Sequence, residues 1–359
     1  MSQKPQEPEQ PENLVSLNHD FFIQWHLTEK CNLRCSHCYQ EPAEQDELSF
    51  QEIKKVITEV RETLADWKNI YDINFSSSYN ITGGEPFLRR DLFQILEEIA
   101  KEGVSIYILS NGTLINKDRA ERLSGLGVKG GQVSVEGPRE IHERIRGKGS
   151  FTKAMKGVKN LLDTGMTVTL NVTLSNLNEG HIHELVSLAK AAGVHRLGFS
   201  RLVPCGRGKQ LLHEMMDTKR VKAMYESLLS LNVSGLEIVT GDPIASRMKL
   251  NASSDMGYTA YGGCAAGISG VTLRPDGTIN PCRRLNIPIG NIRKDSLREV
   301  WATSGVLNSL RDKKRYKGKC AACARWATCR GCRAIAYAYS LSKGEADFLA
   351  EDPQCFLEE

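Results

Sequence analysis

The chain has 359 residues, of which 40% are hydrophobic, and its formal net charge is +4. This length is enough for one large domain with an appendix or for two domains, and the small charge indicates no nucleic-acid partner. No apolar run approaches the roughly 20 residues that a membrane-spanning helix needs. Residues 1–20 begin with a polar, Pro- and Glu-rich stretch that lacks the apolar core of a secretory signal, so we expect a disordered tail and a cytoplasmic protein.

From residue 21 to about residue 203, strand and helix patterns alternate. Helical periodicity follows Ser49 and Glu52, which have the spacing of a capping box, and returns at 151–162 and 178–192. Six repeats predict a parallel sheet covered by helices, as in a partial (β/α)6 TIM-like barrel with functional residues at the C-terminal ends of its strands. The strands predicted from apolar alternation are 21–27, a segment from Tyr71 to about Ile81, 104–109, 132–135, 167–174 and 196–201.

After the barrel, the character of the sequence changes. Residues 204–263 are expected to form a bridging region with one helix at about Thr218–Leu231. From 264 to 359 Gly and Cys become frequent and periodicity fades, so we expect a small, irregular α+β domain that metal holds together. The chain has eleven cysteines, most of them two to five residues apart. Without a secretory signal, that spacing favours metal ligation over disulfides.

Three cysteines follow the first predicted strand. Cys31, Cys35 and Cys38 have the spacing C-x3-C-x2-C, which suits three irons of a four-iron cluster and leaves the fourth iron open to a small molecule. A zinc site is the alternative for this spacing alone. The segment Gly-Gly-Glu-Pro at 83–86 follows the second predicted strand, and its glycines allow another backbone to approach closely. Taken alone, that segment is also compatible with an ordinary turn.

Together, CNLRCSHCY and GGEP resemble the radical S-adenosylmethionine (SAM) superfamily. The resemblance implies that Cys31, Cys35 and Cys38 hold a four-iron (4Fe–4S) cluster whose open iron binds SAM. The implied SAM contacts are Tyr39 near the adenine, Gly83, Gly84 and Glu85 at the methionine amino group, Ser110 at the end of the third strand, Ser134 at the ribose, and Arg146 at the methionine carboxylate.

Some of these residues also have ordinary interpretations. Ser110 begins a Ser-Asn-Gly-Thr segment that is typical of a turn, Tyr39 suits core packing, and Arg146 suits an exposed surface. Members of the superfamily more often have Asp where Glu136 stands, so we assign Glu136 no role at this point. Where Arg146 does contact a carboxylate, the planar guanidinium has the geometry for it.

The C-terminal cysteines resemble those of the SPASM extension, found in radical SAM enzymes that act on peptides and cofactors. The family usually has three residues between the last two cysteines of the quartet that begins at Cys320, whereas this chain has two, Arg330 and Gly331. The resemblance implies two auxiliary clusters, which we expect to be 4Fe–4S. Their implied ligands are Cys320, Cys323, Cys329 and Cys355 for a distal cluster, and Cys264, Cys282 and Cys332 for a nearer one.

The nearer cluster lacks a fourth cysteine close to Cys264. We therefore expect an open iron, a non-cysteine ligand or fewer irons there, and an open iron would let a substrate bind directly. Cys205 lies just after the sixth predicted strand and is interpreted as an ordinary buried thiol. Two structural zinc sites are the alternative for the whole region.

The resemblance implies an enzyme that cleaves SAM reductively to a 5′-deoxyadenosyl radical, which abstracts hydrogen from a substrate. The electron is expected from a low-potential donor such as flavodoxin or ferredoxin. The first hypothesis for the substrate is a ribosomally made peptide that undergoes oxidative modification or thioether-type cross-linking. The segment before Phe21 has no room for a peptide-docking domain, so a separate docking protein is expected.

Other functions remain open. Residues 202–208 and 318–339 resemble haem-synthesis members of the family, so oxidation of propionate side chains in haem, another tetrapyrrole or another cofactor is the alternative. Arg201 and Arg207 are the candidates for binding those carboxylates. Sulfatase-maturing members have Asp where Arg283 stands, which argues against that activity. A zinc-stabilised binding protein without catalysis is a further alternative, and colour would separate it from an iron–sulfur protein.

Overall fold

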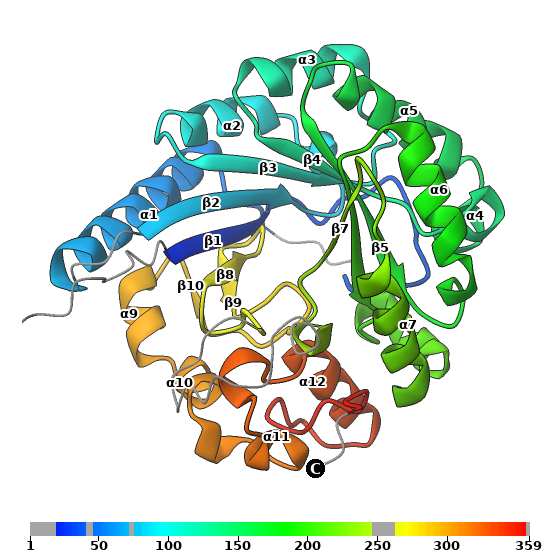
Figure 1. Ribbon diagram of the computed structural model, residues 1–359. Coiled ribbons are helices and arrows are strands. Elements are labelled where there is room, and N and C mark those ends of the chain that lie inside the picture. Colours follow the sequence, from blue (N-terminus) through cyan, green and yellow to red (C-terminus); the bar gives the residue numbers. More distant parts are fainter. Residues whose placement is uncertain (1–18, 41–45, 72–74, 246–262, 357–359) are drawn as a thin grey trace, which may run out of the picture.

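The computed structural model describes residues 19–40, 46–71, 75–245 and 263–356, and a single ten-stranded sheet runs through them in the order β10-β9-β8-β1-β2-β3-β4-β5-β6-β7 (Figure 1). From β8 through β1 to β7 all neighbours pair in parallel, whereas β9 and β10 pair antiparallel. The strands are β1 (His19–His26), β2 (Phe75–Thr82), β3 (Ser105–Ser110), β4 (Gly130–Ser134), β5 (Thr167–Leu174), β6 (Arg196–Arg201), β7 (Glu237–Thr240), β8 (Gly270–Leu273), β9 (Thr278–Asn280) and β10 (Gly290–Asn291).

Helices cover the outer face of the curved sheet, and the short helices of the last part of the chain lie together in a separate group (Figure 1). Short 3-10 turns connect several of them, the longest at Gly206–Glu214. Within the described residues no helix is long and apolar enough to cross a membrane. The α-helices are α1 (Phe50–Tyr71), α2 (Leu92–Ala100), α3 (Lys117–Gly125), α4 (Arg139–Arg146), α5 (Ser150–Leu162), α6 (Ile182–Ala192), α7 (Thr218–Ser230), α9 (Leu297–Thr303), α10 (Gly305–Arg311), α11 (Lys319–Ala322) and α12 (Arg333–Ser342).

The predicted partial barrel is confirmed, and β5 and β6 have the predicted bounds. The capping box before α1 is also present, because the Ser49 amide donates to Glu52 Oε2 over 2.7 Å and the Glu52 amide donates to Ser49 Oγ over 3.3 Å. The predicted start of the second strand at Tyr71 is wrong. Helix α1 continues to Tyr71, since buried Leu64 and Trp67 extend its apolar face; Ile73 lies outside the described residues.

Two strands lie outside the six predicted repeats. Strand β7, in the bridging region, pairs with β6, and β8, in the cysteine-rich region, pairs with β1. At Gly270 the β8 backbone passes so close to the Phe22 carbonyl oxygen that no side chain would fit. The cysteine-rich region is therefore not merely appended to the barrel: its first strands extend the barrel sheet beyond β1.

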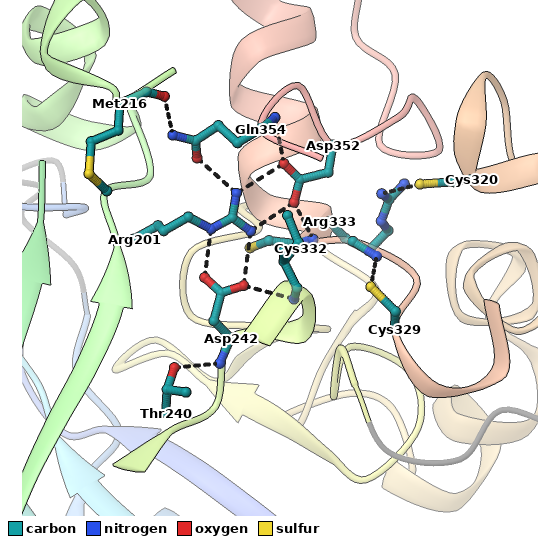
Figure 2. Close-up of polar contacts among 12 residues, drawn as sticks. Arg201, Met216, Thr240, Asp242, Cys320, Cys329, Cys332, Arg333, Asp352 and Gln354 are labelled. Atoms are coloured by element: carbon teal, nitrogen blue, oxygen red, sulfur yellow. Dashed lines mark hydrogen bonds and ion pairs between the residues drawn. The ribbon is translucent and has the colours of Figure 1, made fainter. Parts of the chain in front are cut away.

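A buried ion network joins the end of the barrel to the C-terminal segment (Figure 2). The guanidinium of Arg201, at the end of β6, donates to Asp242 over 2.7 Å and to Asp352 over 2.8 Å. Gln354 also accepts a hydrogen bond from Arg201 and donates one to the Met216 carbonyl. Because these charges are paired and hydrogen-bonded, their interactions offset the free-energy cost of removing them from water.

Candidate functional site

A cavity of about 140 Å³ lies at the C-terminal ends of β1 to β6, and we call it the barrel cavity. The position is the one that the parallel sheet predicts for functional residues. Apart from Glu85, the structure brings together at this cavity every residue that the resemblance implies as a ligand of the barrel cluster or as a SAM contact. These lining residues are Cys31, Cys35, Cys38, Tyr39, Gly83, Gly84, Ser110, Ser134 and Arg146.

In the cysteine loop of the barrel, which contains Cys31, Cys35 and Cys38, hydrogen-bond donors lie close to two of the sulfur atoms. The Leu33 amide donates to Cys31 Sγ over 3.4 Å, and the Arg146 guanidinium donates to Cys35 Sγ over 3.7 Å. The Asn111 side-chain amide lies 3.9 Å from Cys31 Sγ. Such donors stabilise thiolates that bind metal. The donor set therefore fits the cluster that the resemblance implies, and ligation by these three cysteines stays our proposal.

The glycines of the 83–86 segment let its backbone pair with the start of the cysteine loop. The Gly84 amide donates to the Thr28 carbonyl over 2.7 Å, and the Glu85 amide donates to the Lys30 carbonyl over 2.8 Å. A Cβ atom on Gly83 would stand 2.5 Å from the Thr28 carbonyl oxygen. Two neighbouring strand ends are thus fixed to each other where the cysteines begin, which explains why only glycine fits there.

Glu85 does not line the barrel cavity. Its carboxylate is fully buried and accepts hydrogen bonds from Ser110 Oγ over 2.8 Å and from the Asn111 amide over 2.9 Å. Burial raises the pKa of Glu85 to about 7, against the lowering effect of these hydrogen bonds. In this arrangement Glu85 positions the Ser110 turn, and its direct contact with the methionine amino group stays a prediction.

Glu136 is a site residue to which the sequence analysis assigned no role. Its buried carboxylate pairs with Arg146 and lies 3.2 Å from His37 Nε2, and it accepts from the Thr173 amide over 2.8 Å. Burial alone would raise the pKa of Glu136, but Arg146 and His37 hold it well below its usual range. Glu136 therefore orients Arg146 beside Cys35. In the sequence, the only pointer to this pair was the HERIRGKG segment, which contains Arg146 but not Glu136.

The four cysteines expected at the distal cluster line one cavity of about 400 Å³. Arg333 donates to Cys320 Sγ over 3.6 Å, and the Gly331 amide donates to Cys329 Sγ over 3.4 Å (Figure 2). Cys323 and Cys355 complete the lining of this cavity. A closed set of four thiols around one cavity, with donors to the sulfurs, fits a cluster with a full set of cysteine ligands.

The shortened spacing after Cys329 makes a sharp turn. Arg330 has φ 64° and Gly331 has φ 59°, so two consecutive residues adopt the left-handed region, which glycine tolerates and arginine rarely occupies. Arg330 is fixed there by hydrogen bonds to the carbonyls of Ala327, over 2.6 Å, and Cys264, over 2.7 Å. The turn sends Cys329 toward the distal cavity, while Cys332 belongs to the neighbouring apolar cluster with Cys264 packed against it.

The thiols of the C-terminal region are not arranged as single-ion sites. Among the described residues no three His, Cys, Asp or Glu side chains converge on a point where they would share one metal ion. A four-iron cluster has a different requirement, because each thiolate binds its own iron.

A second cavity of about 740 Å³, which we call the outer cavity, adjoins the barrel cavity. Tyr39, Arg283 and Arg284 line both cavities. Arg274 also lines the outer cavity, where it pairs with Glu29 over 2.7 Å. The Arg283 guanidinium makes no hydrogen bond or ion pair with any residue of the described chain, and burial lowers its pKa.

One prediction about substrate binding is wrong. Arg201 was expected to bind a carboxylate of the substrate, but its side chain is fully buried in the ion network of Figure 2. Two internal carboxylates already occupy its donors, so no substrate carboxylate has access. Arg207 does line the barrel cavity, where its Nε donates to the Cys35 carbonyl over 3.2 Å.

Comparison with known proteins identifies the class. Residues 25–189 match the radical SAM superfamily, and residues 264–332 match the SPASM iron–sulfur cluster-binding domain. The chain therefore belongs to the radical SAM superfamily, and it is an enzyme with a SPASM domain. The interpretation as a binding protein without catalysis is wrong.

Individual relatives have different substrates. The AdoMet-dependent heme synthase of Methanosarcina barkeri is 30% identical over 348 residues, which cover 93% of this chain and 95% of that protein. The mycofactocin maturase MftC of Mycolicibacterium smegmatis is 28% identical over 343 residues, covering 93% and 82%. Streptococcus suis SuiB bound to SAM has a TM-score of 0.73 at 19% identity, covering 95% of this chain and 78% of that chain, which confirms the fold.

Proposed function

We propose that this enzyme oxidises an anionic substrate whose carboxylate is bound by Arg283, where the barrel cavity meets the outer cavity. The observation that carries the proposal is the Arg283 guanidinium, which lines both cavities and pairs with no residue in the described part of the chain. A half-buried cation without a partner is costly. A carboxylate that forms charge-assisted hydrogen bonds with it removes that cost.

The residues of this chain have a positioning task. When bound, SAM and its cluster supply the radical that removes a hydrogen atom. Arg283 fixes the carboxylate end of the substrate, so that a neighbouring C–H bond enters the barrel cavity. Tyr39 lines both cavities beside Arg283. No titratable side chain is needed for the abstraction itself.

A tetrapyrrole with propionate side chains is the first candidate substrate. The outer cavity of about 740 Å³ has the size of small-molecule and cofactor sites, which is about 300–1,000 Å³. Besides Arg283, its lining includes Lys209, Arg274 and Arg284, against one acidic residue, Asp276. Relatives named as heme synthase and pre-heme d1 synthase, each 30% identical, support this candidate.

A ribosomally made peptide is the second candidate, and it was the first hypothesis from the sequence. The mycofactocin maturase relative supports it. A terminal or side-chain carboxylate of a peptide would bind Arg283 in the same way as a propionate. For a peptide substrate we further propose a separate docking protein.

The proposal also includes the iron–sulfur clusters and the path of the electrons. We propose three four-iron clusters: one on the barrel cysteines and two in the SPASM domain. A low-potential donor such as flavodoxin or ferredoxin would supply the electron for SAM cleavage. The SPASM clusters would accept the electron that leaves the substrate radical.

Titration with Fe-coproporphyrin III, a porphyrin that carries four propionates, tests the proposal in the reconstituted holoenzyme. We expect Arg283→Met to weaken binding by at least about tenfold, or about 1.4 kcal/mol, and Arg283→Lys to weaken it less, because it keeps the charge but not the planar fork. Arg298→Met is the control, since Arg298 is exposed and pairs with Asp66 on the surface. The control is expected to bind as the parent does.

The outcomes separate the two candidates. Porphyrin binding that is unchanged in Arg283→Met would contradict the assigned role of Arg283. If the parent binds no porphyrin, synthetic peptides with a free or an amidated C-terminus are assayed for stimulation of 5′-deoxyadenosine formation. Stimulation by the free carboxylate alone, lost in Arg283→Met, supports the peptide candidate. Equal behaviour of both peptide forms, together with no porphyrin binding, overturns the proposal.

A further inference from the structure

We propose that Cys205 is the fourth cysteine ligand of the nearer auxiliary cluster, together with Cys264, Cys282 and Cys332. The sequence placed no cysteine near Cys264 for this purpose, and Cys205 was interpreted as an ordinary buried thiol. In the structure, however, Cys205 packs against the same apolar cluster as the other three cysteines. This inference does not depend on the identity of the substrate.

The backbone places Cys205 between the barrel cysteines and the Cys282 turn. The Gly208 amide donates to the Cys38 carbonyl over 3.0 Å, and Gly206, with φ 56°, packs so tightly on Tyr39 that a side chain would clash. These contacts hold the segment after β6 against the cysteine loop. From there Cys205 Sγ reaches to 3.7 Å from the carbonyl oxygen of Arg284, two residues after Cys282.

All four thiols belong to one packed group. Cys332 is a member of the apolar cluster that also contains Val203 and Leu285, and Cys205, Cys264 and Cys282 pack against that cluster. Cys205 is only partly exposed, as a cluster ligand at the edge of a cavity would be. Cys205 precedes Cys264 by 59 residues in the sequence, so no local spacing pattern joins the two.

Arg284 supplies independent support. Its guanidinium interacts electrostatically with Cys332, Cys282 and Cys205, so three of the four thiols face one cation. The Arg284 Nε atom is buried and has no hydrogen-bond partner within the described residues. A buried, unpartnered donor among thiols fits an anionic cluster, whose sulfurs accept such hydrogen bonds.

Ligation by Cys205 changes the chemistry expected at this cluster. On binding, the thiol releases its proton to solvent and Sγ bonds to iron, with no change in oxidation state. Four cysteine ligands leave no iron open to the substrate. The nearer cluster then transfers electrons, and the substrate is held by protein side chains instead of by iron.

The test uses the full chain with Cys31, Cys35 and Cys38 all replaced by Ala, so that the auxiliary clusters are observed without the barrel cluster. We expect about eight irons per chain in this parent. Adding Cys205→Ala is expected to lower the iron count after mild oxidation and to produce the EPR signal of an oxidised three-iron cluster, because the iron without a cysteine ligand is lost. Met215→Ala, which removes packing from the same apolar cluster, is the control and is expected to change neither quantity.

Cys205→Ser keeps the inference testable if the Ala variant folds poorly. Its hydroxyl is a weaker iron ligand of nearly the same size, so we expect a four-iron cluster with an altered EPR spectrum and reduction potential. A spectrum, potential and iron count identical to those of the parent, in both Cys205 variants, would overturn the assignment. It would leave Cys205 as the buried thiol that the sequence suggested.

Discussion

The two halves of this molecule position their cysteines by different means. In the barrel, the loop with Cys31, Cys35 and Cys38 continues from β1, and backbone hydrogen bonds to the turn after β2 fix its start. In the SPASM region, the quartet lies on short turns around the four-residue helix α11. Buried Arg330 donates to the Ala327 carbonyl within those turns, and buried Arg333 donates to the Ala350 carbonyl in the segment before Cys355. Regular sheet structure therefore positions the barrel cysteines, whereas buried charges position the SPASM cysteines.

The difference has a functional counterpart. Cys31 is exposed at a cavity that admits a small molecule, as an open iron requires. Cys320 and Cys329 are buried, and our account gives both auxiliary clusters a full set of thiols. We therefore propose that a molecule binds iron at the barrel cluster and that electrons pass through the SPASM clusters. The predictions below test this division, beginning with the largest expected effect.

Loss of one barrel cysteine is expected to stop the chemistry and spare the other half. In Cys35→Ala, 5′-deoxyadenosine formation with dithionite should fall to background, because the cluster that binds SAM is lost. About eight of about twelve irons should remain. Undiminished SAM cleavage in this variant would contradict the assignment of the barrel cysteines.

Loss of a cysteine ligand of the distal cluster is expected to remove iron from the SPASM domain but to leave SAM cleavage intact. Cys323→Ala should lose up to about four irons and still form 5′-deoxyadenosine, since the barrel loop is fixed by the sheet and not by the SPASM region. Iron analysis and the same dithionite assay provide the measurement. If SAM cleavage disappears together with the distal iron, the two halves are not independent.

The buried link between the halves should matter for stability. Arg201→Met leaves Asp242 and Asp352 buried without their partner, so we expect a loss of about 3–5 kcal/mol in the free energy of unfolding. Urea unfolding of the holoenzyme measures it. Lys159→Met, in an exposed pair with Asp163, is the control and should change stability by less than about 0.5 kcal/mol. Similar losses in both variants would remove the structural role of the network.

The exposed ion pair between Arg293 and Glu52 should contribute least to stability. Arg293 and Ser49 donate hydrogen bonds that lower the pKa of Glu52 to about 2, from an ordinary value of 4.5. Because the pKa is lower in the folded state, this stabilisation is present above about pH 4.5 and is lost as the pH falls toward 2. Glu52→Gln should therefore cost at most about 1 kcal/mol at pH 7, and less at pH 3.5. A difference that grows on acidification would contradict the pairing.

The sequence predicted the barrel site better than the features that depend on distant parts of the chain. The cysteine loop, the glycines at 83 and 84 and the strand ends could be predicted because each signal is local, and parallel strands bring their C-terminal ends together. Strand β8 could not, because four residues carry little periodicity and their partner is β1. The role of Arg201 was missed because its partner Asp352 is 151 residues away in sequence, and a charged residue at the end of a strand carries no local signal that it is buried.

Iron and zinc analysis of the anaerobically reconstituted chain tests the central claim most directly. The account predicts about twelve irons per chain, with about eight when Cys31, Cys35 and Cys38 are replaced by Ala and about eight when Cys320, Cys323 and Cys329 are replaced. Zinc in place of iron, or a count that does not fall by about one cluster in each set of variants, would contradict three separate iron–sulfur sites.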